Sequence, residues 1–309
     1  MSYQDHDIEV LPVNKMDDPA FRKPFFGASH TAALFNDHPF QTAADYWLDK
    51  RDGTSQPETQ PMVRGRHLEA AIATWFAEQE GKKLTESCPY ARGHIIAVPD
   101  REIDAEGALV EIKTTLKYGD EVQDYWVWQC QTNMLVTGAK LTYLVHMDGN
   151  QELHVTRIEA DESVFALIWE RTADFMASLS TGEMPSWIER TAATITRQYP
   201  DPADQIEAGE GGMDVVADYY HLLSESKKYA DAAQILRDQL FEIAGEHEAI
   251  TDDGVVIATF KARAGQRRFD SKTFAADHPE MYEQYRKQGK PTRALEIPKQ
   301  IKTTLDQQS

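Results

Sequence analysis

The chain has 309 residues, with 32 lysines and arginines against 51 aspartates and glutamates, which gives a net charge of −19 at pH 7. A hydrophobic content of 41% supports a substantial core and argues against global disorder. No apolar run reaches the ~18 residues of a membrane span, and the polar N-terminus lacks a signal-peptide pattern. Two cysteines, Cys88 and Cys130, are too few for a disulfide framework, so we expect a cytoplasmic location. The negative charge, taken alone, argues against a nucleic-acid partner.

Composition and periodicity divide the chain into four predicted regions. Residues 1–25 are polar and irregular, and we expect a flexible N-terminal arm. Residues 26–198 carry dense apolar periodicity and are expected to fold as one domain. Residues 199–213 are acidic and contain several glycines, which predicts a solvated linker. Residues 214–309 make up the C-terminal region.

The C-terminal region is predicted to combine helices with a β-hairpin. Apolar residues recur at helical spacing over residues 214–249, and two strand-like runs flank turn residues between 251 and 269. Residues 270–289 also have a helical pattern. From Lys261 to Lys302 the chain has eleven basic and five acidic residues, with aromatic side chains between them. This basic stretch could contact a DNA backbone, or it could be a folded cap whose charges are solvated.

Five elements in the larger region have clear sequence patterns. Helical spacing predicts helices over residues 64–80 and 122–137. Apolar, β-branched runs predict strands over residues 93–99, 108–114 and 141–147. The order helix, strand, strand, helix, strand indicates an α/β fold.

The strand over residues 108–114 carries two charged side chains. Side chains alternate between the faces of a strand, so Glu111 and Lys113 share one face with Leu109. One interpretation is a solvent-facing ion pair on an edge strand. The other is a functional site, which requires further groups nearby.

Asp100 is the first of these further groups. It lies eleven residues before Glu111, and a strand, a short turn and a returning strand would bring the two carboxylates together. Two neighbouring carboxylates repel each other unless a cation lies between them. Mg²⁺ prefers such oxygen ligands. Asp104 is an alternative ligand, although the sequence around it is also typical of a simple turn.

Glu69 is the third acidic candidate. On the predicted helix it lies along a largely apolar stripe, together with Gly65, Ile72, Ala73 and Phe76. An inward-facing carboxylate needs a partner, because burying it alone is costly. That partner could be a nearby arginine, Arg64 or Arg66, or a metal ion shared with Asp100 and Glu111.

Gln131 lies on the inward face of the second predicted helix. Val127, Met134 and Leu135 occupy the same face at helical spacing. The amide could bond to the backbone within the core, or it could take part in an active site.

The order and spacing of these elements resemble the PD-(D/E)XK nuclease superfamily, and more closely its YqaJ-like viral recombinase, or lambda-exonuclease-type, branch. The resemblance covers roughly residues 26–160. It rests on the Gly65…Glu69 helix, Val98-Pro99-Asp100, Glu111-Ile112-Lys113, Tyr125…Gln129-Cys130-Gln131, Met134 to Gly138, the run from Ser29 to Phe35, and Tyr46-Trp47-Leu48. The family usually has Ser-Pro-Asp-Gly where this chain has Val98-Pro99-Asp100-Arg101, so the turn after Asp100 should differ.

The resemblance implies a fold and a site. The fold is an α/β (α+β) restriction-endonuclease-like core, with a central mixed sheet flanked by helices and a C-terminal helical and β-hairpin extension. Mg²⁺, for which Mn²⁺ may substitute, would be held by Glu69, Asp100, Glu111 and the carbonyl of Ile112. Lys113 would position or help deprotonate the attacking water, or neutralise developing charge. Gln131 would orient Lys113 or that water.

The resemblance also implies a function, which is metal-dependent digestion of duplex DNA ends, 5′ to 3′, in phage-type recombination. A ring-shaped homo-oligomer and a single-strand annealing protein are the implied partners, in a bacterial host cytoplasm if the chain is phage-encoded. Ser29 would bind the terminal 5′ phosphate, or would cap a helix. Two alternatives remain open at this point: a structure-specific or restriction-type endonuclease, and a non-enzymatic module that binds another protein.

Overall fold

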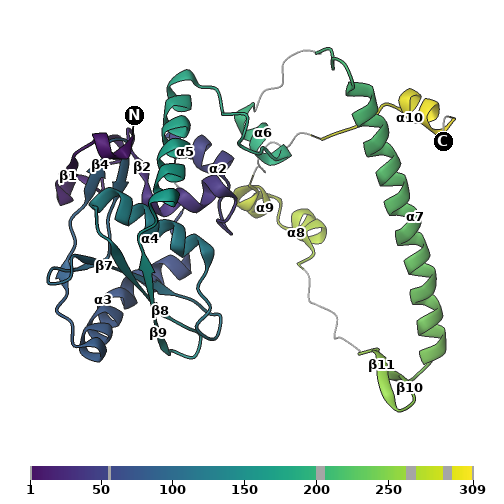
Figure 1. The fold of residues 1–309 in the computed structure, drawn as a ribbon. Helices are drawn as coiled ribbons and strands as arrows, with labels where there is room; N and C mark the ends of the chain where they lie inside the picture. The colour runs from purple at the N-terminus through teal and green to yellow at the C-terminus, as the bar shows by residue number, and fades with distance from the viewer. Residues whose placement is uncertain (1, 55–56, 200–205, 262–268, 288–293, 308–309) are drawn as a thin grey trace. The chain divides into compact units, whose positions relative to one another are not determined.

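The computed structural model describes the chain except for residues 1, 55–56, 200–205, 262–268, 288–293 and 308–309 (Figure 1). The chain divides into two compact units, Met1–Tyr199 and Pro200–Ser309. Residues 200–205 of the predicted linker at 199–213, and five cations of the basic stretch, lie outside the described residues. The functional division of the chain into four regions therefore stays a prediction.

The N-terminal unit is organised around a five-stranded mixed sheet. The strand order is β3-β6-β7-β8-β9, in which β7 and β8 are parallel and the other neighbours are antiparallel. The strands are β3 (Thr85–Glu86), β6 (Arg101–Ile103), β7 (Ala108–Thr114), β8 (Leu141–Met147) and β9 (Leu153–Glu159). β7 and β8 have the bounds that the sequence pattern predicts.

Two helices, α3 (Gln60–Glu80) and α4 (Asp124–Thr137), cover opposite faces of this sheet (Figure 1). Phe76 of α3 packs in one hydrophobic cluster with Val110 and Ile112 of β7. Leu109, from the other face of β7, belongs to the cluster that contains Met134 of α4. The predicted alternation of β7 is therefore confirmed. The expectation of a mixed sheet flanked by helices is also confirmed.

A second, four-stranded sheet has the order β1-β4-β5-β2. Its strands are β1 (Ile8–Val10), β2 (Phe26–Gly27), β4 (Tyr90–Arg92) and β5 (Ile95–Ala97). The segment predicted to be a flexible arm thus contributes a paired strand, and Tyr3 is buried against Phe165.

The pairing expected for the strand over 93–99 is wrong. β5 pairs with β4 and β2, whereas the short strand β6 pairs with β7. The chain leaves one sheet and enters the other across Val98-Pro99-Asp100. Proline has no backbone N–H, so the ladder is interrupted there.

Helices complete the N-terminal unit around a core that contains Phe26, Trp47 and Phe175. The indole N–H of Trp47 donates to Ser178 Oγ at 2.8 Å, which ties α2 to α5. The remaining helices of this unit are η1 (Tyr3–Asp5), η2 (Val13–Lys15), α1 (Pro19–Arg22), η3 (Ala28–Phe35), α2 (Ala43–Asp52), α5 (Glu162–Thr181) and α6 (Ala192–Gln198).

The C-terminal unit contains the predicted long helix and hairpin. Its elements are α7 (Gly212–Ala244), β10 (Ala249–Asp252), β11 (Val255–Thr259), α8 (Ser271–Asp277), α9 (Pro279–Tyr285) and α10 (Lys299–Asp306). The single helix expected over 270–289 is two helices, because Pro279 cannot continue the hydrogen bonding of α8 and begins α9 instead. Among the helices of the described residues, none is both long and apolar enough to cross a membrane.

Candidate active site

Strand β7 places Glu111 and Lys113 on the face of the sheet that α4 covers. β7 is a central strand, and Glu111 is only 1% exposed, so the pair is not an ordinary solvent-facing ion pair. The Lys113 ammonium donates to Glu111 Oε1 at 2.6 Å. A buried carboxylate of this kind is costly unless every acceptor position finds a donor or a cation.

Asp100 lies beside this pair, at the point where the chain changes sheets. Its Oδ2 accepts the backbone N–H of Ile112 at 2.6 Å, which fixes the carboxylate against β7. Burial and the charge of Glu111 raise the pKa of Asp100 well above its usual value, and Lys113 offsets this only in part. The structure therefore brings Asp100, Glu111 and Lys113 together.

Asp104, the alternative ligand, lies elsewhere. It is an exposed residue in the turn between β6 and β7, and its Oδ1 accepts the hydroxyl of Thr85 at 3.0 Å. Because Ile103 pairs with Ala108, this turn is at the far end of the hairpin from Glu111. The geometry favours Asp100 over Asp104 as a partner of Glu111.

Lys113 is held as an ammonium. Burial alone would lower its pKa, but the charges of Glu111 and Asp100, together with the hydrogen bond to Glu111, raise the pKa above its usual value. The ammonium also donates to Gln129 Oε1 at 2.8 Å. Its position is thus fixed by β7 from one side and by α4 from the other.

Helix α4 supplies two amides to the cluster, and neither is the predicted one. Gln129 accepts from Lys113, and Asn133 Nδ2 donates to Glu111 Oε2 at 2.9 Å. The two residues are four positions apart, so they share one face of the helix. Gln131 and Thr132 are also polar residues of this helix, so the spacing of Gln129 and Asn133 alone does not identify this face from the sequence.

Gln131, which the resemblance assigned to orienting Lys113 or the attacking water, bonds to the backbone in this structure. Gln131 Nε2 donates to the carbonyl of Glu159 at 2.8 Å, and its Oε1 accepts the N–H of Asp161 at 3.0 Å. The backbone-bonded alternative is therefore the one that the structure adopts. Gln131 ties α4 to the end of β9.

Glu69 is paired with an arginine that the sequence analysis did not consider as its partner. Arg101 donates to Glu69 Oε1 at 2.8 Å and lies 3.4 Å from Glu86 Oε1. Arg66, a predicted partner, instead pairs with Glu58. Arg101 and Val110 are paired across β6 and β7, which places Arg101 on the α3 side of the sheet. Arg101 occupies the position where the resembled family usually has glycine.

The groups around Asp100 and Glu111 are suited to a hard divalent cation. Two carboxylates of this kind supply the oxygen ligands that Mg²⁺ prefers, and the carbonyl of Ile112 is adjacent in sequence. Asn133 Oδ1 is buried and has no hydrogen-bond partner among the described residues. Because Asn133 is hydrogen-bonded to Glu111, this unbonded acceptor indicates a site in which a cation or its water would be favourable.

A second group of potential metal ligands lies at the β8–β9 turn. Asp148, Glu152 and His154 each have one potential ligand atom within 4.8 Å of those of the other two residues. Asp148 is buried and already accepts the backbone N–H groups of Gly119, Asn150 and Glu152 at 2.8, 2.8 and 2.9 Å. These bonds lower the pKa of Asp148, the bond from Gly119 most of all. The three side chains could hold a metal ion, but Asp148 also has a clear structural role.

Ser29, the predicted phosphate ligand, is exposed on η3. The N-cap of this helix is Gly27, so Ser29 does not have the alternative capping role. η3 packs against α4, where Thr132 Oγ1 donates to Thr31 Oγ1 at 2.8 Å. Ser29 thus lies on an element adjacent to the helix that carries Gln129 and Asn133.

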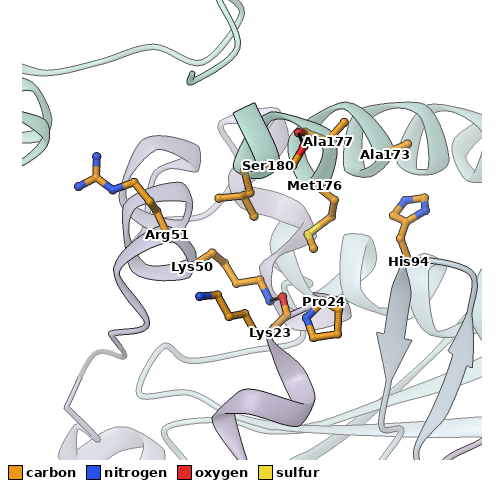
Figure 2. Close-up of a pocket in the computed structure, with 10 residues that line it drawn as sticks. Lys23, Pro24, Lys50, Arg51, His94, Ala173, Met176, Ala177 and Ser180 are labelled. Carbon is orange, nitrogen blue, oxygen red and sulfur yellow. Dashed lines mark hydrogen bonds between the residues drawn. The ribbon is translucent and has the colours of Figure 1, made fainter. Parts of the chain in front are cut away.

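A cavity of about 550 Å³ lies between α2, α5 and the segment after α1 (Figure 2). Its lining includes Lys23, Lys50, Arg51 and His94, and none of the residues that line it is acidic. Lys50 donates to the carbonyls of Arg22, Lys23 and Phe25, so this ammonium anchors the end of α1. Burial and the charge of Arg22 lower the pKa of Lys50 to about 8. None of the predicted site residues lines this cavity.

Comparison with known proteins gives one family match and several similar structures. Residues 19–140 match the profile of the YqaJ-like viral recombinase domain. The alkaline exonuclease LHK-Exo from Laribacter hongkongensis is 23% identical, with a TM-score of 0.44, over 52% of this chain and 91% of that chain. Its complex with dAMP gives 22% identity, a TM-score of 0.46 and the same coverage. A phage-related exonuclease from Haemophilus somnus is 10% identical, with a TM-score of 0.41, over 51% of this chain and 94% of that chain. Among curated proteins, none matches.

Proposed function

We propose that this chain, whose residues 19–140 carry a YqaJ-like viral recombinase domain, is a metal-dependent deoxyribonuclease that digests duplex DNA from its ends. The observation that supports this most is the group formed by the buried Glu111 with the half-buried Asp100 and Lys113. It combines two adjacent carboxylates, which need a cation, with an ammonium that stays charged. All three residues fall within the matched region.

Each residue of this group has a role that follows from its contacts. Asp100 and Glu111, with the carbonyl of Ile112, would hold Mg²⁺ or Mn²⁺. A bound divalent cation would lower the pKa of a water molecule and stabilise negative charge on the phosphoryl oxygens. Lys113 remains an ammonium, so we assign it to charge neutralisation and orientation rather than to proton abstraction. Gln129 and Asn133 hold Lys113 and Glu111 in place.

Glu69 has a less direct role in this proposal. Its carboxylate is bonded to Arg101, but its charge still contributes to the raised pKa of Asp100. It therefore lies close enough to strengthen the attraction of the site for a cation. We propose that Glu69 acts through this charge, and that direct metal ligation would require Arg101 to move.

The metal should be obligatory for DNA to approach. The chain has a net charge of −19, and the group around Glu111 is itself acidic, so it repels a phosphate in the absence of a cation. The 5′-to-3′ direction, the role of Ser29 at the 5′ phosphate, a ring-shaped assembly and an annealing partner are further proposals. They rest on the family and not on contacts of this chain.

Digestion of linear duplex DNA, labelled at one end or the other, tests the proposal. The purified chain is incubated with Mg²⁺, with Mn²⁺ or with chelator, on substrates with and without a 5′ phosphate, beside a closed circular duplex. We expect loss of label from the 5′ ends, metal dependence and an intact circle. Cleavage of the circle would favour an endonuclease. Intact linear DNA under every condition would refute nuclease activity.

A further inference from the structure

Helix α7 carries a regular apolar seam along its length. The seam consists of Val215, Tyr219, Leu222, Ser226, Tyr229, Ala233, Leu236, Leu240 and Ile243. Successive members are separated by alternating steps of four and three residues. This spacing is the a/d pattern of a heptad repeat, in which every 3.5 residues a side chain returns to the same side of a slightly supercoiled helix.

Within the C-terminal unit the seam is open, whereas other sides of α7 are covered locally. All nine seam residues are exposed, and Val215, Leu222, Tyr229 and Ile243 are each at least 66% exposed. On another side of the helix, Tyr220 donates to Asp306 of α10 at 3.0 Å and is half-buried.

The β10–β11 hairpin covers the C-terminal end of α7. Phe241 packs on Phe260, with ring centroids 4.9 Å apart, and Ala244 is buried. Within the described part of the C-terminal unit, the local partners of α7 therefore leave the seam free.

The residue spacing of the seam favours another helix as the element that packs against it. A heptad repeat with no charged member over this length is typical of a coiled coil, whereas a helix that packs on a globular surface usually has a wider apolar stripe with a 3.6-residue period. The seam spans residues 215–243, which is about 42 Å at 1.5 Å per residue. Exposed apolar side chains over that distance would be unfavourable in water.

The length of the seam distinguishes α7 from the other described helices of this chain. The next longest helices, α3 and α5, have 21 and 20 residues, against 33 in α7. Both place large apolar side chains, such as Phe76 of α3 and Phe175 of α5, in the core of the N-terminal unit. Among the helices of the described residues, only α7 itself has a free seam of matching length and repeat.

We propose that two copies of this chain associate through α7, seam against seam, in a two-stranded coiled coil. Ser226 and Ala233 are the small members near the middle, and they allow the helices to approach closely there. The large members at both ends provide most of the apolar contact. This inference does not depend on the proposed nuclease activity.

Sedimentation velocity of the full chain over a concentration series tests the association. Leu236 belongs to the seam and Ile235 does not, yet both are 61% exposed. Leu236→Glu is expected to weaken dimerisation at least roughly tenfold, because it places a carboxylate in the seam. Ile235→Glu is the matched control and should leave the dissociation constant unchanged. Circular dichroism of both variants reports whether α7 stays helical.

A second pair of variants avoids any loss of folding. Ser226 lies in the seam and Ser224 lies outside it, and both are exposed. Ser226→Leu fills the seam and should tighten the dimer, whereas Ser224→Leu should not. A wild-type chain that sediments as a monomer would overturn the proposal and mean that its own N-terminal unit or another protein covers the seam. Equal effects of the two leucine variants, or an oligomer insensitive to Leu236→Glu, would also overturn it.

Discussion

The N-terminal unit contains two acidic groups that differ in how their carboxylates are satisfied. Asp148, at the β8–β9 turn, accepts three backbone N–H groups and lies 3.6 Å from His154 Nε2. Asp100 accepts one backbone N–H and faces a second carboxylate, that of Glu111. The comparison separates an aspartate that holds a turn together from one whose burial and neighbouring carboxylate outweigh the nearby ammonium of Lys113.

The pKa shifts of the two aspartates have opposite signs for this reason. Backbone hydrogen bonds lower the pKa of Asp148, whereas burial and the charge of Glu111 raise the pKa of Asp100. Folding thus favours the ionised form of Asp148 and opposes the ionised form of Asp100. A bound cation would lower the pKa of Asp100 and so favour its ionised form. At Asp148 the backbone hydrogen bonds already favour the ionised form, so a cation would change that pKa less.

Removing the ammonium of the site should have the largest effect. Lys113→Ala is expected to lower the rate of DNA digestion by on the order of 10³-fold or more, since it removes a fixed charge from the reacting centre. It also leaves Glu111 buried without its partner, which should cost about 3–5 kcal/mol of stability. Gel assays of linear DNA with Mg²⁺ measure the first effect, and denaturant unfolding measures the second.

Lys140→Ala is the matched control for this change. Lys140 and Glu162 form an ion pair at 3.4 Å, but both side chains are mostly exposed. Such pairs contribute roughly 0–1 kcal/mol, so activity and stability should hardly change. If Lys113→Ala digested DNA at a rate close to that of Lys140→Ala, the proposed site would be wrong.

The two aspartates should give opposite pH dependence of stability in metal-free protein. With a folded-state pKa raised above 3.8, Asp100 keeps a proton that the unfolded chain loses, so stability falls as pH rises from about 3.8 through the folded pKa. Asp100→Asn should therefore be more stable than wild type at neutral pH, because its uncharged amide avoids the unfavourable ionisation of Asp100. The gain should shrink toward acid.

Asp148→Asn should behave in the opposite way. A folded-state pKa below 3.8 stabilises the fold at any pH above 3.8, and this contribution is lost as pH falls through the folded pKa. The variant should therefore unfold more easily than wild type at neutral pH, with the difference closing in acid. Urea unfolding at several pH values checks both variants. If both variants changed the stability at neutral pH in the same direction, the proposed difference between the environments of Asp100 and Asp148 would be wrong.

Arg101 offers a test of whether Glu69 can join the metal site. Arg101→Gln frees the Glu69 carboxylate, whose charge then adds to those of Asp100 and Glu111. We expect Mn²⁺, measured by calorimetry, to bind several-fold more tightly, with a modest loss of stability. Arg66, like Glu69, is on α3. Arg66→Gln breaks its exposed pair with Glu58 and is the control, which should leave Mn²⁺ binding unchanged. Equal Mn²⁺ affinity in both variants would mean that Arg101 does not restrain Glu69.

The sequence predicts the parts of this site that depend on local periodicity. Alternation along β7 is enough to place Glu111 and Lys113 on one face, and the short separation from Asp100 is enough to bring that carboxylate beside them. The pairing of Glu69 with Arg101, in contrast, does not follow from local periodicity. Arg101 reaches it only because the chain changes sheets at Pro99, which places β6 rather than β5 beside β7. Which short strands pair in a sheet depends on tertiary contacts, and these cannot be predicted from the spacing of apolar residues in the sequence.

The choice between the two glutamines of α4 illustrates the same limit. Gln129 and Gln131 differ by two positions, or about 200° around the helix, and Cys130 lies next to both. Which of the two meets β7 is set by the tertiary packing of α4, whose Met134 and Leu135 lie in one cluster with Leu109 of β7. The sequence therefore indicates that an amide faces the site but does not determine which one.

The smallest predicted effects separate these two glutamines. Gln129→Ala removes the acceptor that positions Lys113, so the rate of DNA digestion should fall about 10-fold or less, with little change in stability. Gln131→Ala removes two hydrogen bonds to the backbone at the end of β9, which should cost roughly 1–3 kcal/mol while leaving the rate per folded molecule unchanged. Each variant serves as the control for the other, and rates are normalised to the folded fraction measured by circular dichroism. Because the two side chains point to opposite sides of one helix, loss of rate in Gln131→Ala but not in Gln129→Ala would mean that α4 presents its other face to the site.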